Sequence, residues 1–250
     1  MLDVALPLAF GFLLVLLRTA GLCVTAPVLS ASSVPMRVRL AVSAALAFAV
    51  FTGAGLPVVD APPNLFSFAY AGLVETAIGL GGGLCARMLL EAAQAAGSVA
   101  GLSSGLGYGA LVDPLNGAAS TVAGQLFSML ALGITVSLGL PGEAVAWLAR
   151  SVVQIPPGHA VDLPALVQAL ITTAATASAL SMRLCFPFMA AGLIAHASLG
   201  VLGRAAPQLN LQSVGFSISL AAGGFALYLV APVVAEAAAR SAAGFFAGGP

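Results

Sequence analysis

The chain has 250 residues, of which 60% are hydrophobic and only 6% are charged. A soluble domain carries roughly 25% charged residues, so this composition excludes a water-soluble globular protein. It predicts an integral membrane protein, or a subunit of an assembly that buries nearly all of its surface. Eight acidic residues balance eight basic ones, all of them arginine, so the sequence offers no basic patch for nucleic acid.

Cysteine and histidine are sparse. Cys23, Cys85 and Cys185 lie far apart in apolar runs, so we expect small packing residues rather than disulfides or zinc ligands. His159 and His196 are the only histidines, too few for a metal cluster or an acid–base pair. The sequence therefore predicts no metal site, no cofactor and no enzyme.

The first apolar run covers residues 4–29. It is longer than the core of a signal peptide, roughly 7–15 residues, and is expected to remain as a helix. Arg18 within it needs a buried partner, unless it lies near a helix end from which its side chain reaches water. The following segment carries Arg37 and Arg39, which is typical of a cytoplasmic loop.

Five further apolar runs follow, and a bilayer crossing takes roughly 20 residues. The run at 163–202 is nearly twice that length and has Pro187 inside it, so it predicts either a bent helix or a hairpin. Hydropathy alone leaves the number of spans open. The five runs cover residues 38–59, 65–90, 122–140, 163–202 and 209–235.

A ladder of residues spaced by four begins in the third run. Positions four apart form a stripe along a helix, and small residues on it let a neighbouring helix approach closely. A glutamate on this stripe has no place in lipid unless it is paired or faces protein or water. The arginine and the second glutamate are expected to pair with each other. The ladder consists of Glu75, Gly79, Gly83, Arg87 and Glu91.

The segment GSVAGLSSGLGYGALVDP at 97–114 fits several motifs. Its G-x-S-x-G match follows an alanine-rich helical sequence instead of a strand, which excludes a hydrolase nucleophile elbow. Its alternating glycines lack the G-K-[ST] of a phosphate loop. Gly97 and Gly101 are expected to continue the small-residue face of the helix. Beyond them the sequence predicts a loop that is either extramembrane or a gate between buried helices.

A second polar interruption, LGRAAPQLNLQSVGF at 202–216, contains Arg204, Pro207 and Gln208. It is interpreted as a cytoplasmic turn or as a contact with another subunit. The methionines show no helical stripe and are expected in the core; they are Met36, Met88, Met129, Met182 and Met189.

Three blocks together resemble the FliR family, which includes the SctT-type subunits of type III injectisomes. They are RTAGLCVTAPVLSASSVPMRVRLAV (18–42), GLSSGLGYGALVDP (101–114) and LGVLGRAAPQLNLQSVGF (199–216). The resemblance covers essentially the whole chain. It implies an all-α integral membrane fold of long, kinked helices and hairpins. Residues 1–160 would be a FliP-like portion, and residues 161–250 a FliQ-like hairpin.

The resemblance implies a structural subunit of the flagellar type III export gate, with no catalytic activity and no cofactor. Its implied partners are FliP and FliQ, together with FlhB, unfolded flagellar export substrates and membrane lipid, but no nucleic acid. Its implied location is the bacterial inner membrane at the flagellar basal body, as a multi-pass protein. The SctT-type subunit of an injectisome and a stand-alone small transporter or channel are the alternatives.

The resemblance also implies site residues. A channel plug would lie near residues 105–117, with Gly105, Leu106, Gly107, Tyr108, Gly109, Ala110, Leu111, Val112, Asp113 and Pro114 as its matching positions. Helix packing and subunit contacts would involve the ladder residues Glu75, Gly79, Gly83, Arg87, Glu91, Gly97 and Gly101, with Arg18, Arg204, Pro207 and Gln208.

Overall fold

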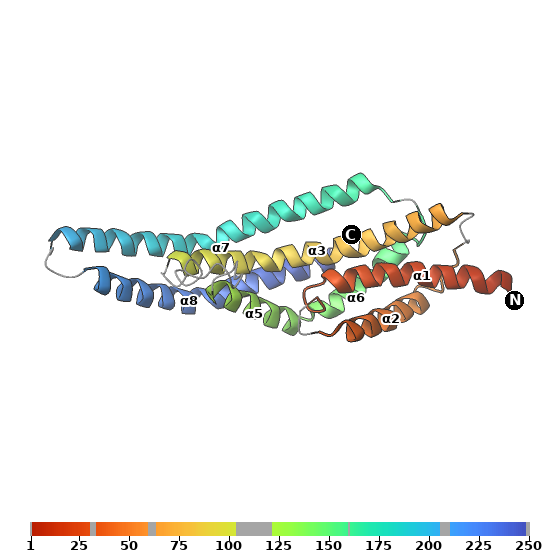
Figure 1. Ribbon diagram of the computed structural model, residues 1–250, viewed down its shortest axis with the longest axis horizontal. Coiled ribbons are helices and arrows are strands. Elements are labelled where there is room, and N and C mark those ends of the chain that lie inside the picture. Colours follow the sequence, from red (N-terminus) through yellow and green to blue (C-terminus); the bar gives the residue numbers. More distant parts are fainter. Residues whose placement is uncertain are drawn as a thin grey trace. The chain divides into compact units, whose positions relative to one another are not determined.

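The computed structural model describes residues 2–30, 34–59, 64–103, 122–159, 161–205 and 211–248, and none of these lies in a strand. The prediction of an all-α membrane fold is confirmed. The helices, labelled in Figure 1, are α1 (Leu2–Thr25), α2 (Met36–Gly53), α3 (Leu65–Ser103), α5 (Val122–Ser137), α6 (Leu140–Gln154), α7 (Leu163–Ala205) and α8 (Leu211–Ala247).

The helices follow the apolar runs with two differences. The long run at 163–202 is a single helix, α7, with Pro187 inside it, so the run holds no hairpin. Helix α6 corresponds to none of the predicted runs, because Glu143 and Arg150 interrupt its hydropathy. Its apolar residues nevertheless repeat with helical spacing, and Leu140, Trp147 and Leu148 are buried.

Local polar residues begin the helices. Asn64 Oδ1 accepts a hydrogen bond from the Ser67 N–H at 2.9 Å, which caps the first turn of α3. Asp162 Oδ1 accepts the Ala165 N–H at 3.4 Å at the start of α7. Helix α6 begins after Gly139, whose φ of +78° suits glycine.

Five helices are long and apolar enough to cross a membrane, which makes the chain a multi-pass membrane protein. The candidate spans are Ala5–Thr25, Met36–Gly53, Leu65–Ser103, Leu163–Ser198 and Tyr228–Ala247. The pair Ala123–Ser137 and Leu140–Gln154, separated by a short break, supplies a sixth if it counts as one span. Helix α3 has 39 residues and is therefore about 60 Å long, twice the thickness of a hydrocarbon core of about 30 Å.

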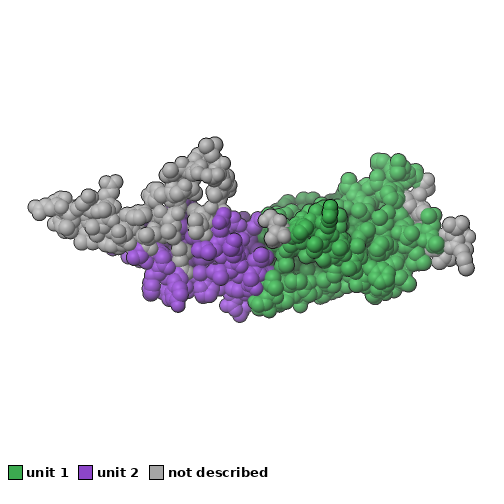
Figure 2. Space-filling model, turned by 60° about the horizontal axis from the view of Figure 1, so that its bottom comes forward, with its two compact units in different colours: residues 1–88, 136–174, 241–250 green, residues 89–135, 175–240 purple. Residues whose placement is uncertain are grey.

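The chain forms two compact units, coloured separately in Figure 2. Unit 1 consists of Met1–Met88, Val136–Ala174 and Ser241–Pro250. Unit 2 consists of Leu89–Thr135 and Ala175–Arg240. The chain passes from one unit to the other inside α3, α5, α7 and α8, so no boundary between the units falls in a described loop.

Unit 1 is held by aromatic and small side chains. Helices α1 and α2 lie side by side (Figure 1), and the rings of Phe12 and Phe51 meet edge to face at 5.5 Å. The ring of Phe246, in the last turn of α8, is 5.9 Å from the indole of Trp147 in α6. Arg150 Nη2 also donates a hydrogen bond to the Phe246 carbonyl. The end of α8 therefore completes the packing of α6.

In unit 2, Phe127 of α5 packs on Phe188 of α7 with 5.8 Å between ring centroids.

All three cysteines of the chain are buried free thiols, which confirms their predicted packing role.

The prediction that the methionines lie in the core was wrong for four of the five. Their exposed fractions are 58% for Met36, 70% for Met129, 73% for Met182 and 55% for Met189. A chain surrounded by lipid or by partner subunits carries apolar residues on its outside as well as inside, so hydropathy does not identify its core.

Candidate functional site

The most polar feature inside the apolar helices is an ion pair between α1 and α3. Arg18 Nε lies 2.6 Å from Glu75 Oε2, and the two side chains are 0% and 1% exposed. A charged residue at membrane depth requires such a partner. From the sequence, Arg18 and Glu75 were each expected to need a partner, and the structure pairs them with each other.

The Arg18 guanidinium also contacts the end of α6. Nη1 donates to the Ser151 carbonyl at 2.8 Å and to Ser151 Oγ at 3.2 Å, and Nη2 donates to the Ile155 carbonyl at 3.0 Å. The last carbonyls of a helix have no partner within the helix and carry partial negative charge. The Ser151 carbonyl also accepts the Ile155 N–H at 2.9 Å, so Arg18 is its second donor. Arg18 also supplies a donor to the Ile155 carbonyl while it neutralises Glu75.

Glu75 completes the arrangement from the other side. Its Oε1 accepts a hydrogen bond from the Gly158 N–H at 3.0 Å. Gly158 lies in the turn between α6 and α7 and has a φ of +80°, which a glycine adopts without strain. The Arg18–Glu75 centre, defined by these two side chains with Ser151, Ile155 and Gly158, thus ties α1, α3 and the α6–α7 turn together.

This centre is suited to holding helices in place. Each nitrogen of the Arg18 guanidinium and both Glu75 oxygens have a protein partner. The Ser151 hydroxyl donates back to the Leu148 carbonyl at 2.9 Å, so its proton is committed within α6. Within the described residues no group of three or more histidine, cysteine or acidic side chains could hold a metal ion.

The glycines of the predicted ladder lie where two backbones meet. A methyl group added at Gly79 would overlap the carbonyl of Arg18, and one at Gly83 would overlap the hydroxyl of Thr25. Thr25 Oγ1 donates across the same contact to the Leu80 carbonyl at 3.2 Å. Close approach of α1 and α3 therefore depends on glycine, and it places Arg18 within reach of Glu75.

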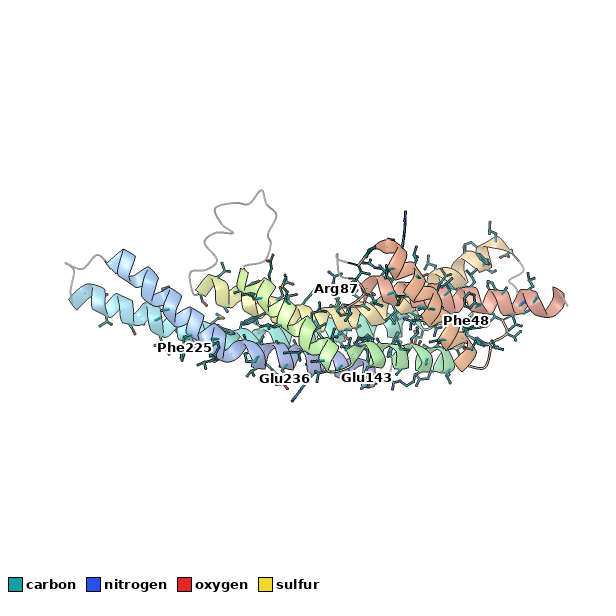
Figure 3. The ribbon with its side chains drawn as sticks, turned by 90° about the horizontal axis from the view of Figure 1, so that it is seen from below. Phe48, Arg87, Glu143, Phe225 and Glu236 are labelled. Atoms are coloured by element: carbon teal, nitrogen blue, oxygen red, sulfur yellow. The ribbon has the colours of Figure 1, made fainter. Side chains whose placement is uncertain are left out.

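The ladder continues in the part of α3 that belongs to unit 2. A methyl group at Gly97 would lie 2.8 Å from the Ala123 carbonyl oxygen of α5. Gly101 is buried in the last turn of α3. Arg87 and Glu91, by contrast, are exposed on α3, and Figure 3 labels Arg87. Their expected mutual pairing remains a prediction.

The remaining predicted site residues fall into two groups. Arg204 is exposed in the last turn of α7. Pro207, Gln208 and the whole plug segment, residues 105–117, lie outside the described residues.

Sequence reasoning did not identify Ser151, Ile155 and Gly158 as parts of the site. Ile155 and Gly158 contribute only backbone atoms, and a residue's type does not reveal such a role. Gly158 carried the one usable signal, because it follows two prolines in a turn sequence, PPGH.

The positive φ of Gly158 gives a direct test of the turn. Gly158→Ala is expected to lower the free energy of unfolding by about 1–2 kcal/mol, because an L-residue in the left-handed region is strained by that amount. The added methyl would also lie 2.9 Å from Val59 Cγ1. The measurement is the thermal unfolding midpoint in detergent. Gly142→Ala in α6 is the matched control, because its added methyl would meet nothing within 4 Å. Its unfolding midpoint should not fall.

Comparison with known proteins finds one family along nearly the whole chain. The family model described as "Bacterial export proteins, family 1" matches residues 9–244. The flagellar biosynthetic protein FliR of Escherichia coli (strain K12) is 28% identical over 220 residues, which are 88% of this chain and 84% of that protein.

FliR proteins of other bacteria match the chain over a similar length. The FliR protein of Bacillus subtilis (strain 168) is 29% identical over 84% of this chain and 82% of its own length. That of Aquifex aeolicus (strain VF5) is 26% identical over 87% of this chain and 83% of its own. With a family model spanning residues 9–244, the chain belongs to the bacterial export proteins, family 1, the family of the flagellar biosynthetic FliR proteins.

Proposed function

We propose that the chain is a structural subunit of the flagellar type III protein export gate. In this proposal it forms, with FliP and FliQ, the channel that passes unfolded flagellar proteins across the bacterial inner membrane, with FlhB associated. The observation that carries the proposal is the family match over residues 9–244. Residues 1–160 would be the FliP-like portion and residues 161–250 the FliQ-like hairpin.

The surface of the described helices supports a role in an assembly. Phe48 of α2 and Phe225 of α8, both labelled in Figure 3, are 62% and 64% exposed. On α7, Phe186, Leu193 and Ile194 are exposed by 71%, 72% and 67%. Apolar faces of this extent require lipid or partner helices.

In this proposal the Arg18–Glu75 centre has a positioning role. It fixes α1, α3 and the end of α6 with respect to each other, so the faces that these helices present to partners have a defined geometry. The exposed Arg87, Glu91 and Arg204 would then meet neighbouring subunits or lipid headgroups, together with Pro207 and Gln208.

Co-purification tests the proposal. The tagged chain is expressed with the FliP-type and FliQ-type proteins of the same bacterium or without them. We expect a stable stoichiometric complex in the first case and loss of the chain to aggregation or proteolysis in the second. A monodisperse chain that is stable alone and fails to retain the other proteins would contradict a gate subunit and favour a stand-alone transporter.

The plug is a separate part of the proposal. Deletion of residues 105–117 is expected to leave the complex assembled but to make the membrane permeable to small ions, because the closed channel loses its obstruction. The measurement is ion flux in cells or liposomes that carry the variant complex. The complex that contains the unaltered chain serves as the comparison, and unchanged permeability of the 105–117 variant would exclude a plug there.

A further inference from the structure

An isolated arginine lies in the middle of α7. Arg183 is exposed, and it forms no hydrogen bond or ion pair with any residue that the structure describes. Residues 163–182 before it and 184–203 after it contain no aspartate, glutamate, lysine or arginine. Arg183 is therefore the single charge between Asp162 and Arg204.

The length of α7 decides whether lipid alone can cover it. Its 43 residues extend about 65 Å at about 1.5 Å per residue. A hydrocarbon core about 30 Å thick holds about 39 Å of a helix tilted by about 40°, the upper end of the usual range. At least about 17 residues of α7 therefore lie outside the hydrocarbon, whichever part of the helix crosses it.

The part outside the hydrocarbon is too apolar to face water. Neither flank of Arg183 has the composition of a soluble protein, in which roughly 25% of residues are charged. Both flanks expose large apolar side chains, with Val167 and Ile171 exposed by 52% and 57%, and Leu193 and Val201 by 72% and 69%. Exposed apolar surface of this kind marks a protein contact when lipid does not cover it. Another protein chain therefore covers at least one flank.

The residues next to Arg183 are also exposed and apolar. Met182, Phe186 and Met189 are exposed by 73%, 71% and 55%. Their spacing of four and three residues places them on one stripe of the helix, and Arg183 borders that stripe three residues before Phe186. A partner that packs on this stripe removes the Arg183 guanidinium from water.

An arginine removed from water requires a partner of opposite charge. In unit 2 the described acidic residues are Glu91 and Glu236, and neither forms an ion pair with Arg183. Arg18 shows how this chain holds an arginine within an apolar helix, because it is 0% exposed and lies 2.6 Å from Glu75 of another helix. For Arg183 the corresponding carboxylate has to come from outside the described helices.

We propose that the face formed by Met182, Arg183, Phe186 and Met189 docks on an apolar helix of a second protein chain, and that this helix carries an aspartate or glutamate that pairs with Arg183. The carboxylate supplies the opposite charge, and apolar residues of the partner helix cover the three apolar side chains beside it. The proposal rests on the proposed function, because it requires that the chain assembles with other proteins.

Photo-cross-linking identifies the partner helix. The complex of the full-length chain with its co-purifying FliP-type and FliQ-type proteins carries p-benzoylphenylalanine at position 186. After irradiation, mass spectrometry maps the cross-linked peptide. We expect an apolar segment of another chain, with an acidic residue within about one helical turn, roughly four residues, of the cross-link.

Competition measures the contribution of the charge. Differently tagged unaltered and variant chains are expressed together with limiting partner proteins, and their ratio in the purified complex is determined. Arg183→Gln should be incorporated at least about tenfold less than the unaltered chain, because truncating one member of a desolvated charge pair weakens association by that factor or more. Arg183→Lys keeps the charge and should lose less. Arg240→Gln is the control and should compete equally, because Arg240 is exposed and pairs with Glu236 of its own chain.

Charge reversal distinguishes an ion pair from a general disturbance of the interface. Arg183→Glu places a second carboxylate opposite the first and should be incorporated even less than Arg183→Gln. Exchange of the cross-linked partner's acidic residue for arginine should restore its incorporation, whereas the same exchange should exclude the chain that keeps Arg183.

Three results would overturn the proposal while the complex still forms, and they would leave the proposed function intact. Cross-links from position 186 to lipid alone would mean that no protein covers the face. Equal incorporation of Arg183→Gln and the unaltered chain would mean that no carboxylate meets Arg183. Restoration of Arg183→Asp by Asp113→Arg in the same chain would assign the carboxylate to this chain. Failure of the unaltered chain to form any complex would instead refute the proposed function, and this proposal with it.

Discussion

Arg18→Met is expected to lower the free energy of unfolding of the chain by about 3–5 kcal/mol, the loss typical when one partner of a buried ion pair is removed. The substitution leaves Glu75, which is 1% exposed, charged without its 2.6 Å partner. It also removes the Arg18 donor from the Ile155 carbonyl and one of the two donors of the Ser151 carbonyl, which keeps the Ile155 N–H. The measurements are the thermal unfolding midpoint in detergent and the amount of chain in the membrane fraction.

A double-mutant cycle distinguishes the ion pair from general packing. Glu75→Leu alone should also be severe, but Arg18→Met with Glu75→Leu should cost less than the sum of the two, because the second change removes the charge that the first left unpaired. Strictly additive losses would contradict this account.

An exposed pair of the same type serves as the control. Arg240 Nη2 and Glu236 Oε1 are also 2.6 Å apart, but their side chains are 70% and 47% exposed. Arg240→Met should therefore cost only about 0.3–0.5 kcal/mol, as for other i, i+4 pairs on helices. Similar losses for Arg18→Met and Arg240→Met would show that burial does not decide the effect.

Gly79→Ala is expected to destabilise the chain by about 3 kcal/mol, the upper end of the range for overpacked sites. The added methyl would overlap the carbonyl oxygen of Arg18, and a backbone atom cannot move aside as a flexible side chain can. Helices α1 and α3 must separate, which also lengthens the Arg18–Glu75 contact. Loss of the chain from the membrane fraction and a lower unfolding midpoint are the measurements.

Gly133→Ala provides the matched control for that change. Gly133 lies within α5, and its added methyl would meet nothing within 4 Å. Alanine has the better helix propensity, so this variant should gain about 0.5–1 kcal/mol. If both glycine variants behave alike, close backbone approach at Gly79 does not control stability.

Composition and hydropathy predicted a membrane protein with several long apolar runs, and the all-α fold was an implication of the family resemblance. The spacing of Gly79 and Gly83 also indicated a helix-packing face. The partners of that face were not predictable, because contacts between residues far apart in sequence, such as Arg18 and Glu75, leave no periodic signal. Helix α6 was missed because its charged residues lower its hydropathy, although its apolar residues keep helical spacing.

The site was predicted only in part for a related reason. Arg18 and Glu75 were identified because a charge within an apolar run is conspicuous. The groups that complete their coordination are the Ser151 and Ile155 carbonyls and the Gly158 N–H. Every residue type offers a backbone carbonyl, and every type except proline offers an N–H. Only the path of the backbone determines which of them meet the side chains.

The division of unit 1 into separated stretches of sequence affects the order in which the protein is made. Phe246, fully buried against Trp147, comes from the last turn of α8, about a hundred residues after its partner is synthesised. During translation Trp147 and Arg150 therefore emerge long before the residues that cover them. The helices made earlier therefore remain in the membrane, or bound to an insertion factor, until residues 241–247 are synthesised. A premature stop within α8 would thus also leave part of α6 uncovered, about a hundred residues earlier in the chain.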